Sequence, residues 1–188
     1  MERKGLYNVL RLNWLKNPDE THVEPWQVED LRTKSLEELF SQLAKKEILL
    51  DELAFAAYAN NVDNPEQLTE MLTDTSTTGD ITSASAAFDQ IYLICFELWR
   101  RLCSAKDPLV LLYDELDYQI SAYDSGQGSK DKVRQSLAEL ASFMPHNQPE
   151  KAGAAFKIAT EECATDLNTF LYDFILETIE LDDFAYAE

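Results

Sequence analysis

The sequence of 188 residues has few of the residues on which local catalytic and metal-binding motifs depend. It contains two histidines (His22 and His146), three cysteines (Cys95, Cys103 and Cys163) and five glycines. Neither histidine belongs to a Glu-x-x-His or His-x-x-x-His pair, the cysteines lack the spacing of a metal site, and the glycines form no phosphate-binding loop. We therefore predict no catalytic residue, no metal and no cofactor. Catalytic groups can converge from distant positions, so enzymatic activity stays open, but the composition favours a protein that is not an enzyme.

A long apolar run is also missing. Uninterrupted apolar runs such as Ile91–Phe96 are far shorter than the about 20 residues that a membrane helix needs. The start of the chain does not resemble a signal peptide, because polar residues interrupt its apolar stretch. The three cysteines lie within helical apolar patterns, which predicts buried, reduced thiols. These features together predict a cytoplasmic protein that does not contact a membrane.

Basic residues are scarce. Sixteen Lys and Arg stand against thirty-five Asp and Glu, which gives a net charge of −19. Segments 35–80 and 149–188 each carry −8, so most of the charge belongs to two separate parts of the chain. Direct binding to nucleic acid or to an anionic membrane needs clustered Lys and Arg. The charge therefore disfavours both and favours a protein partner with a basic surface.

The small number of glycines and the absence of strand-like alternation predict an all-α fold, a bundle of about seven or eight helices. Several helix starts are marked in the sequence. Ser35 and Glu38 have the spacing of a capping box, Asp51 has the position of an N-cap, and Pro65 and Pro149 suit the first position of a helix. We expect a single helical domain over residues 1–188, with possible sub-units 1–72 and 84–188 joined by a Thr/Ser-rich loop at 73–83.

The last part of the chain combines acidic and apolar residues. Residues 158–188 hold nine carboxylates and no Lys or Arg, yet more than half of them are apolar. This pattern predicts one long, largely buried C-terminal helix from Pro149 to about Leu181, with a division near Gly153 as the alternative. On a helical wheel five carboxylates share an arc of about 60°. These candidate partner-binding residues are Glu162, Asp166, Asp173, Glu177 and Glu180.

The two most apolar segments, 84–104 and 154–181, are expected to form the central pair of the bundle. Eight of their residues are then predicted to share one core: Phe88, Ile91, Cys95, Trp99, Leu167, Phe170, Leu171 and Phe174. Elsewhere, Asp114 and Asp117 lie opposite an apolar helix face, and we interpret them as part of a solvated polar face and not as a metal site.

The function that this sequence favours is a non-catalytic interaction domain of the adaptor, chaperone-like or inhibitor type, which binds a basic protein through acidic helical faces. The alternative is an enzyme or regulatory domain with a carboxylate pocket between helices. A nucleic-acid mimic is disfavoured, because the stripe has about one charge per 5 Å of helix, while B-DNA has one per about 1.7 Å. The oligomeric state is left open.

Overall fold

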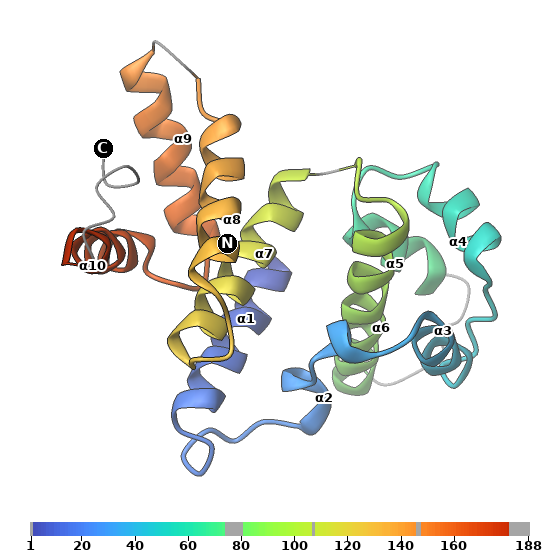
Figure 1. Ribbon diagram of the computed structural model, residues 1–188. Coiled ribbons are helices and arrows are strands. Elements are labelled where there is room, and N and C mark those ends of the chain that lie inside the picture. Colours follow the sequence, from blue (N-terminus) through green and yellow to red (C-terminus); the bar gives the residue numbers. More distant parts are fainter. Residues whose placement is uncertain (1, 74–80, 107, 146–147, 181–188) are drawn as a thin grey trace. The chain divides into compact units, whose positions relative to one another are not determined.

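The computed structural model describes residues 2–73, 81–106, 108–145 and 148–180 (Figure 1). In these ranges the regular elements are ten α-helices and one 3-10 helix, with no strand, so the all-α prediction is confirmed. The predicted count of seven or eight helices was too low, partly because the expected long C-terminal helix is two helices. Within the described ranges no helix is both long enough and apolar enough to cross a membrane.

The contacts within the chain group it into two compact units. Unit 1 comprises residues 1–16 and 112–188, and unit 2 comprises residues 17–111. The Thr/Ser-rich segment 73–83 falls within the range of unit 2, and its residues 74–80 lie outside the described part of the chain. The helices on either side of that segment pack on each other inside unit 2. The expectation of one domain over residues 1–188 stays a prediction.

Unit 2 is built around its last and longest helix. Nine consecutive residues of that helix, Ile91–Trp99, are buried, as the apolar composition of the segment predicts. Four shorter elements pack around it. In chain order the elements are α2 (Pro25–Val28), the 3-10 helix η1 (Leu31–Thr33), α3 (Leu36–Ala44), α4 (Glu52–Ala59), α5 (Pro65–Thr73) and α6 (Ile81–Leu102).

Local signals fix where these helices begin. Ser35 accepts a hydrogen bond from the amide of Glu38, whose carboxylate accepts one from the amide of Ser35, so the predicted capping box is present. Asp51 caps α4 by accepting from the amide of Ala54. Each cap satisfies a backbone donor that has no partner within its own helix.

The end of α6 carries an internal cluster of charges. Buried Glu97 accepts hydrogen bonds from the guanidinium groups of Arg100 and Arg101 at 2.6–2.9 Å. Arg101 also donates to the backbone carbonyls of Leu31, Arg32 and Lys34, which ties η1 to α6. These basic residues therefore hold unit 2 together.

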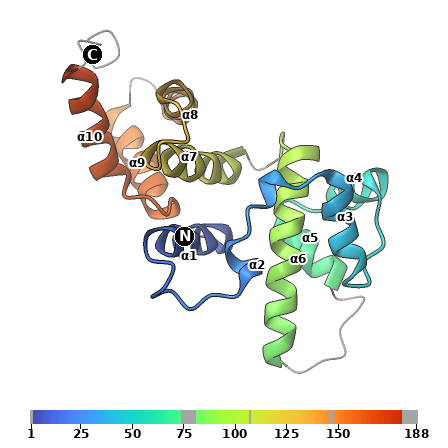
Figure 2. The ribbon, with the colours of Figure 1, turned by 60° about the horizontal axis from the view of Figure 1, so that its bottom comes forward.

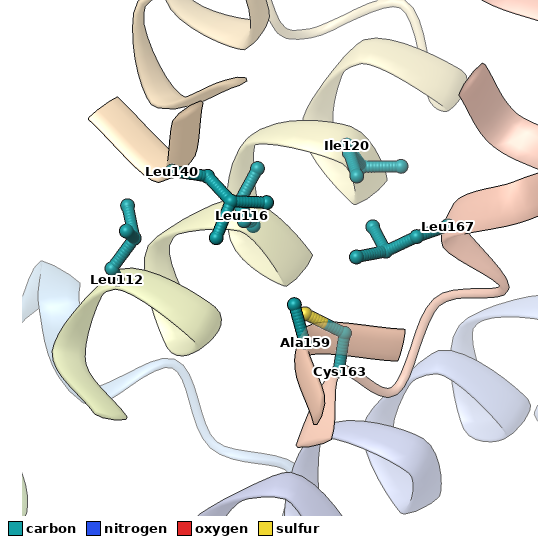
Figure 3. Close-up of a cluster of buried hydrophobic side chains, with 7 residues drawn as sticks. All are labelled: Leu112, Leu116, Ile120, Leu140, Ala159, Cys163 and Leu167. Carbon is teal, nitrogen blue, oxygen red and sulfur yellow. The ribbon is translucent and has the colours of Figure 1, made fainter. Parts of the chain in front are cut away.

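Unit 1 is a bundle of five helices. A cluster of apolar side chains joins four of them, as Figure 3 shows, with Leu112, Leu116 and Ile120 meeting Leu140, Ala159, Cys163 and Leu167. The fifth helix is the N-terminal one, which lies along the polar side of α7. The helices are α1 (Arg3–Lys16), α7 (Pro108–Asp124), whose first residues 108–111 belong to unit 2, α8 (Lys130–Ser142), α9 (Pro149–Glu162) and α10 (Leu167–Glu180).

The prediction of one long C-terminal helix was wrong. The chain leaves the helical conformation at Cys163, where φ is −73° and ψ is 145°, and becomes helical again at Leu167. Figure 1 shows α9 from the side and α10 nearly along its axis, so the chain turns sharply between them. The alternative division near Gly153 is also wrong, because Gly153 lies inside α9. Leu181, the predicted end of the helix, lies outside the described residues.

The two segments expected to form the central pair, with the common core predicted between them, fall in different compact units. Helix α6 belongs to unit 2, whereas α9 and α10 belong to unit 1, and each unit has its own core. Four of the predicted core residues lie in α10. Leu167 and Phe174 are buried, but Phe170 and Leu171 are only partly buried. Both segments are apolar, and this property does not specify that one packs on the other.

Candidate functional site

The turn between α9 and α10 is held by a buried carboxylate on another helix. Asp117 of α7 is 3% exposed, and its two carboxylate oxygens accept hydrogen bonds from the backbone amides of Ala164 and Thr165, each at 2.9 Å. The amide group of Asn8, on α1, donates a third hydrogen bond at 3.1 Å. Asp117 thereby satisfies the backbone donors that are freed where α9 ends.

Its neighbour Asp114 is also buried, at 4% exposure. The Lys4 amino group lies 2.7 Å from Asp114 Oδ1, and Asn8 donates to the same oxygen at 3.1 Å. The interpretation of Asp114 and Asp117 as a solvated face was therefore wrong, because polar residues of α1 cover that side of α7. Both carboxylates are used to join α1, α7 and the α9–α10 turn.

Burial shifts the pKa values in this region. It raises the pKa of Asp117, and the hydrogen bonds from Ala164, Thr165 and Asn8 partly oppose that shift. Burial also raises the pKa of the Cys163 thiol, and the nearby carboxylate of Asp117 adds to the effect. A thiol that stays protonated is a poor nucleophile and a poor metal ligand. Among the described residues no group of three or more His, Cys, Asp or Glu side chains could hold a metal ion.

One side of α10 packs into unit 1. Phe174 is buried, with its ring stacked on Phe170 at 5.4 Å and edge-to-face with Tyr123 of α7 at 5.7 Å. The amino group of Lys130, at the start of α8, lies 5.4 Å from the centre of the Phe174 ring. These aromatic and cation–π contacts fix which side of the helix faces inward.

The opposite side of α10 presents a second apolar face. Its four side chains are Tyr172, which is 66% exposed, and Ile175, Leu176 and Ile179, which are each 40–43% exposed. Their spacing of i, i+3, i+4 and i+7 places them within an arc of about 100° on the helix. The prediction of a largely buried helix was therefore wrong: α10 is apolar on two sides, and one of them is open. We call these four residues the outer face of α10.

The five predicted partner-binding residues are not on one helix. Glu162 is the last residue of α9 and accepts a hydrogen bond from the backbone amide of Glu2 at 2.8 Å. Asp166 precedes α10 and caps it by accepting from the amides of Asn168 and Thr169. Hydrogen bonds from Thr169 lower the pKa of this exposed carboxyl. The predicted stripe is therefore interrupted between Glu162, which ends α9, and Asp166, which caps the helix that carries the other three.

The remaining three carboxylates lie on α10. Asp173 and Glu180 are exposed and follow one edge of the outer face. Glu177 lies further toward the interior, where it accepts a hydrogen bond of 2.5 Å from the Tyr123 hydroxyl and lies 3.8 Å from the Lys130 amino group. Only Asp173 and Glu180 therefore combine exposure with a position beside the outer face. Whether any of the five binds a partner stays a prediction.

Sequence reasoning missed the outer face of α10, although its residues were visible. A helix that is apolar except for a narrow polar stripe has the same sequence pattern in two cases. All of its apolar sides can be buried, or one apolar side can be buried while another is exposed. A signal for the break was also present: Asp166 stands before Leu167 as an N-cap residue inside an apolar pattern.

Comparisons with protein-family models, with curated proteins and with solved structures found no match for this chain.

Proposed function

We propose that this protein is a non-catalytic interaction protein of the adaptor, chaperone-like or inhibitor type. It binds a protein partner through α10, and the partner presents an apolar groove bordered by Lys or Arg. The observation that carries the proposal is the outer face of α10, with apolar residues at helical spacing and carboxylates along one edge. This spacing is the one with which amphipathic helices bind to grooves on other proteins.

The apolar residues supply the binding energy in this proposal. Fully burying an Ile, Leu or aromatic side chain stabilises a complex by about 1.5–3 kcal/mol. The outer face is already partly covered by its own helix, so each residue has on the order of 1 kcal/mol left to contribute. Tyr172 is the most exposed of the four, and tyrosine is one of the residue types enriched at the centre of interfaces.

The carboxylates determine the charge of the partner. Asp173 and Glu180 border the outer face, α10 contains no Lys or Arg, and the chain carries a net charge of −19. A basic rim on the partner would be attracted over a distance, and an acidic one would be repelled. These charges therefore act mainly on the association rate and on specificity. The carboxylate pocket of the alternative hypothesis has no such support, because Asp114 and Asp117 are engaged inside unit 1.

The test begins with site-specific photo-crosslinking. A benzophenone amino acid in place of Tyr172 labels whatever covers the outer face in cell extract, and the same group in place of Leu53, which is 83% exposed in unit 2, gives the background. The crosslinked protein is then purified, and its affinity for the unlabelled chain is measured by calorimetry at low and high salt.

Two variants separate the apolar and charged contributions. I175S/I179S shortens the outer face, and D173K/E180K reverses its edge without touching Glu177, which has internal partners. We expect each to weaken the purified complex at least tenfold, whereas the control L49S/L53S leaves it unchanged. A partner with an acidic surface, or one whose affinity is unaffected by both variants, would disprove the proposal. So would a homodimer that I175S/I179S dissociates, because a second copy would then cover the face.

A further inference from the structure

Unit 2 contains an open cavity of about 280 Å³, far along the chain from α10. Three parts of the unit surround it: the α2–η1 segment, the end of α3 and the middle of α6. Four apolar side chains line it, namely Trp26, Leu31, Leu93 and Ile94. Leu93 and Ile94 are themselves buried and belong to the central helix, so the cavity reaches the core of unit 2.

Two lysines stand at this cavity, and they are unusual within the unit. Unit 2 has seven Lys and Arg residues, and five of them interact with other groups of the chain. Arg100 and Arg101 donate hydrogen bonds to Glu97, and Lys34 forms an ion pair with Glu29 at 2.9 Å. Lys106 donates to the carbonyls of Ala59 and Val62, and Arg32 also interacts with other groups of the chain.

The other two, Lys45 and Lys46, both line the cavity. Within the described ranges neither amino group has a hydrogen-bond or ion-pair partner. Unit 2 carries an excess of eleven negative charges, so two unengaged cations at one cavity contrast with the rest of its surface.

The backbone fixes the place of these lysines. They follow α3 in a tight turn, in which the amides of Lys46 and Ile48 both donate to the carbonyl of Leu43 at 2.8 and 3.1 Å. The turn requires a positive φ of 66° at Glu47, a conformation that non-glycine residues adopt at a cost. The turn therefore holds the backbone that carries the two lysines in a defined position beside the cavity.

Two glutamine side chains complete the polar part of the cavity. Gln42 on α3 and Gln90 on α6 also line it, and their side-chain amides have no partner within the described part of the chain. The one carboxylate among the lining residues, Glu29, is engaged by Lys34. Small-molecule sites commonly combine an apolar floor with a few convergent polar groups.

We propose that this cavity binds a small aromatic carboxylate. The carboxylate would accept hydrogen bonds from the amino groups of Lys45 and Lys46, and the ring would lie against Trp26 and the buried leucine and isoleucine of α6. The cavity volume is slightly below about 300 Å³, the lower end of the range for small-molecule sites. The ligand therefore contains few rings and is not a long-chain lipid. This proposal is independent of the one for α10, because it concerns different residues in the other unit.

Three compounds with one ring system and different charges test it: 2-naphthoate, the neutral 2-naphthalenemethanol and the cationic 2-naphthylmethylammonium. Binding to the full chain is followed by NMR through the indole N–H signals of its three tryptophans. The Trp26 signal reports on the cavity, and the Trp14 signal in unit 1 is the internal control. We expect 2-naphthoate to shift the Trp26 signal saturably, with an affinity about tenfold higher than that of the alcohol, and the cation to bind most weakly.

The variant K45Q/K46Q removes both charges and keeps the length of the side chains close to the original. We expect it to bind 2-naphthoate about tenfold more weakly and the alcohol with unchanged affinity. The control K151Q/K157Q removes two lysines from α9 in unit 1 and should not affect either compound. Equal affinities for the three compounds, a shift of Trp14 without one of Trp26, or no saturable binding would each refute the proposal. If K45Q/K46Q fails to fold, the ranking of the three compounds on the natural chain decides the question.

Discussion

Replacement of Asp117 by asparagine tests whether this carboxylate holds the α9–α10 turn. Asparagine has the same shape, but only one of its two terminal atoms accepts a hydrogen bond. In the natural protein both oxygens accept from backbone amides, Oδ2 from Ala164 and Oδ1 from Thr165. In D117N the NH₂ group would face one of these N–H groups, so a buried donor loses its acceptor.

The size of the effect follows from two opposing contributions. A hydrogen bond to a charged acceptor is worth about 1.5–3 kcal/mol, and a buried donor without a partner costs about 1–3 kcal/mol. On the other side, burial raises the pKa of Asp117, which means that its charge is unfavourable inside unit 1, and asparagine avoids that cost. We expect a net loss of about 1–3 kcal/mol in the free energy of unfolding of unit 1.

Two measurements check this prediction. Urea denaturation of D117N gives the loss of stability, and amide hydrogen exchange shows where it arises. The amides of Ala164 and Thr165 should exchange faster in D117N than the change in global stability explains. The control D124N removes a carboxylate from an exposed position on the same helix and should alter neither measurement. If D117N is as stable as the natural protein and those two amides exchange at their original rates, the role given to Asp117 is wrong.

Two further predictions concern a strained turn and a tyrosine. E47G should raise the free energy of unfolding by about 0.5–1 kcal/mol in urea denaturation, because glycine adopts the positive φ of 66° without strain, whereas E47A should gain nothing. Burial, followed by the hydrogen bond to Glu177, raises the pKa of Tyr123 from 10 to about 12. Its contribution to stability is therefore complete below pH 10 and is lost as the pH rises toward about 12, since the unfolded chain releases the proton first. The difference in unfolding free energy between the natural protein and Y123F should be constant below pH 10 and should shrink above it, and a difference independent of pH would contradict this assignment.

Local features of the fold were predictable from the sequence. The cap at Ser35, the cap at Asp51 and the helix starts at Pro65 and Pro149 were predicted from residue types at fixed spacings, and the structure confirms them. Such signals depend on backbone groups within one turn of the residue. The central position of α6 in unit 2 also followed from its composition, because a helix that is apolar on all sides must be covered on all sides.

Features that depend on contacts between distant segments were not predictable. Asp114 and Asp117 lie on the polar side of α7, and only the position of α1, about 110 residues earlier in the chain, shows that this side is covered. Composition could not separate the two units either, because apolar segments of both have the same patterns. The five carboxylates share a wheel position only if residues 162–180 form one helix, and the break after Cys163 removes that condition.

The break explains why α10 has two apolar sides. If α9 continued without a break, the four residues of the outer face would lie further along the axis of α9. The turn held by Asp117 instead starts α10 in a new direction (Figure 2). Contacts of Phe174 and Glu177 with Tyr123 then decide which side of α10 faces α7 and α8, and the opposite side becomes the outer face. The proposed docking surface therefore depends on Asp117 and Tyr123 of α7, which do not belong to it. The outer face is only partly covered within unit 1, and in our proposal a protein partner with an apolar groove bordered by basic residues covers the rest.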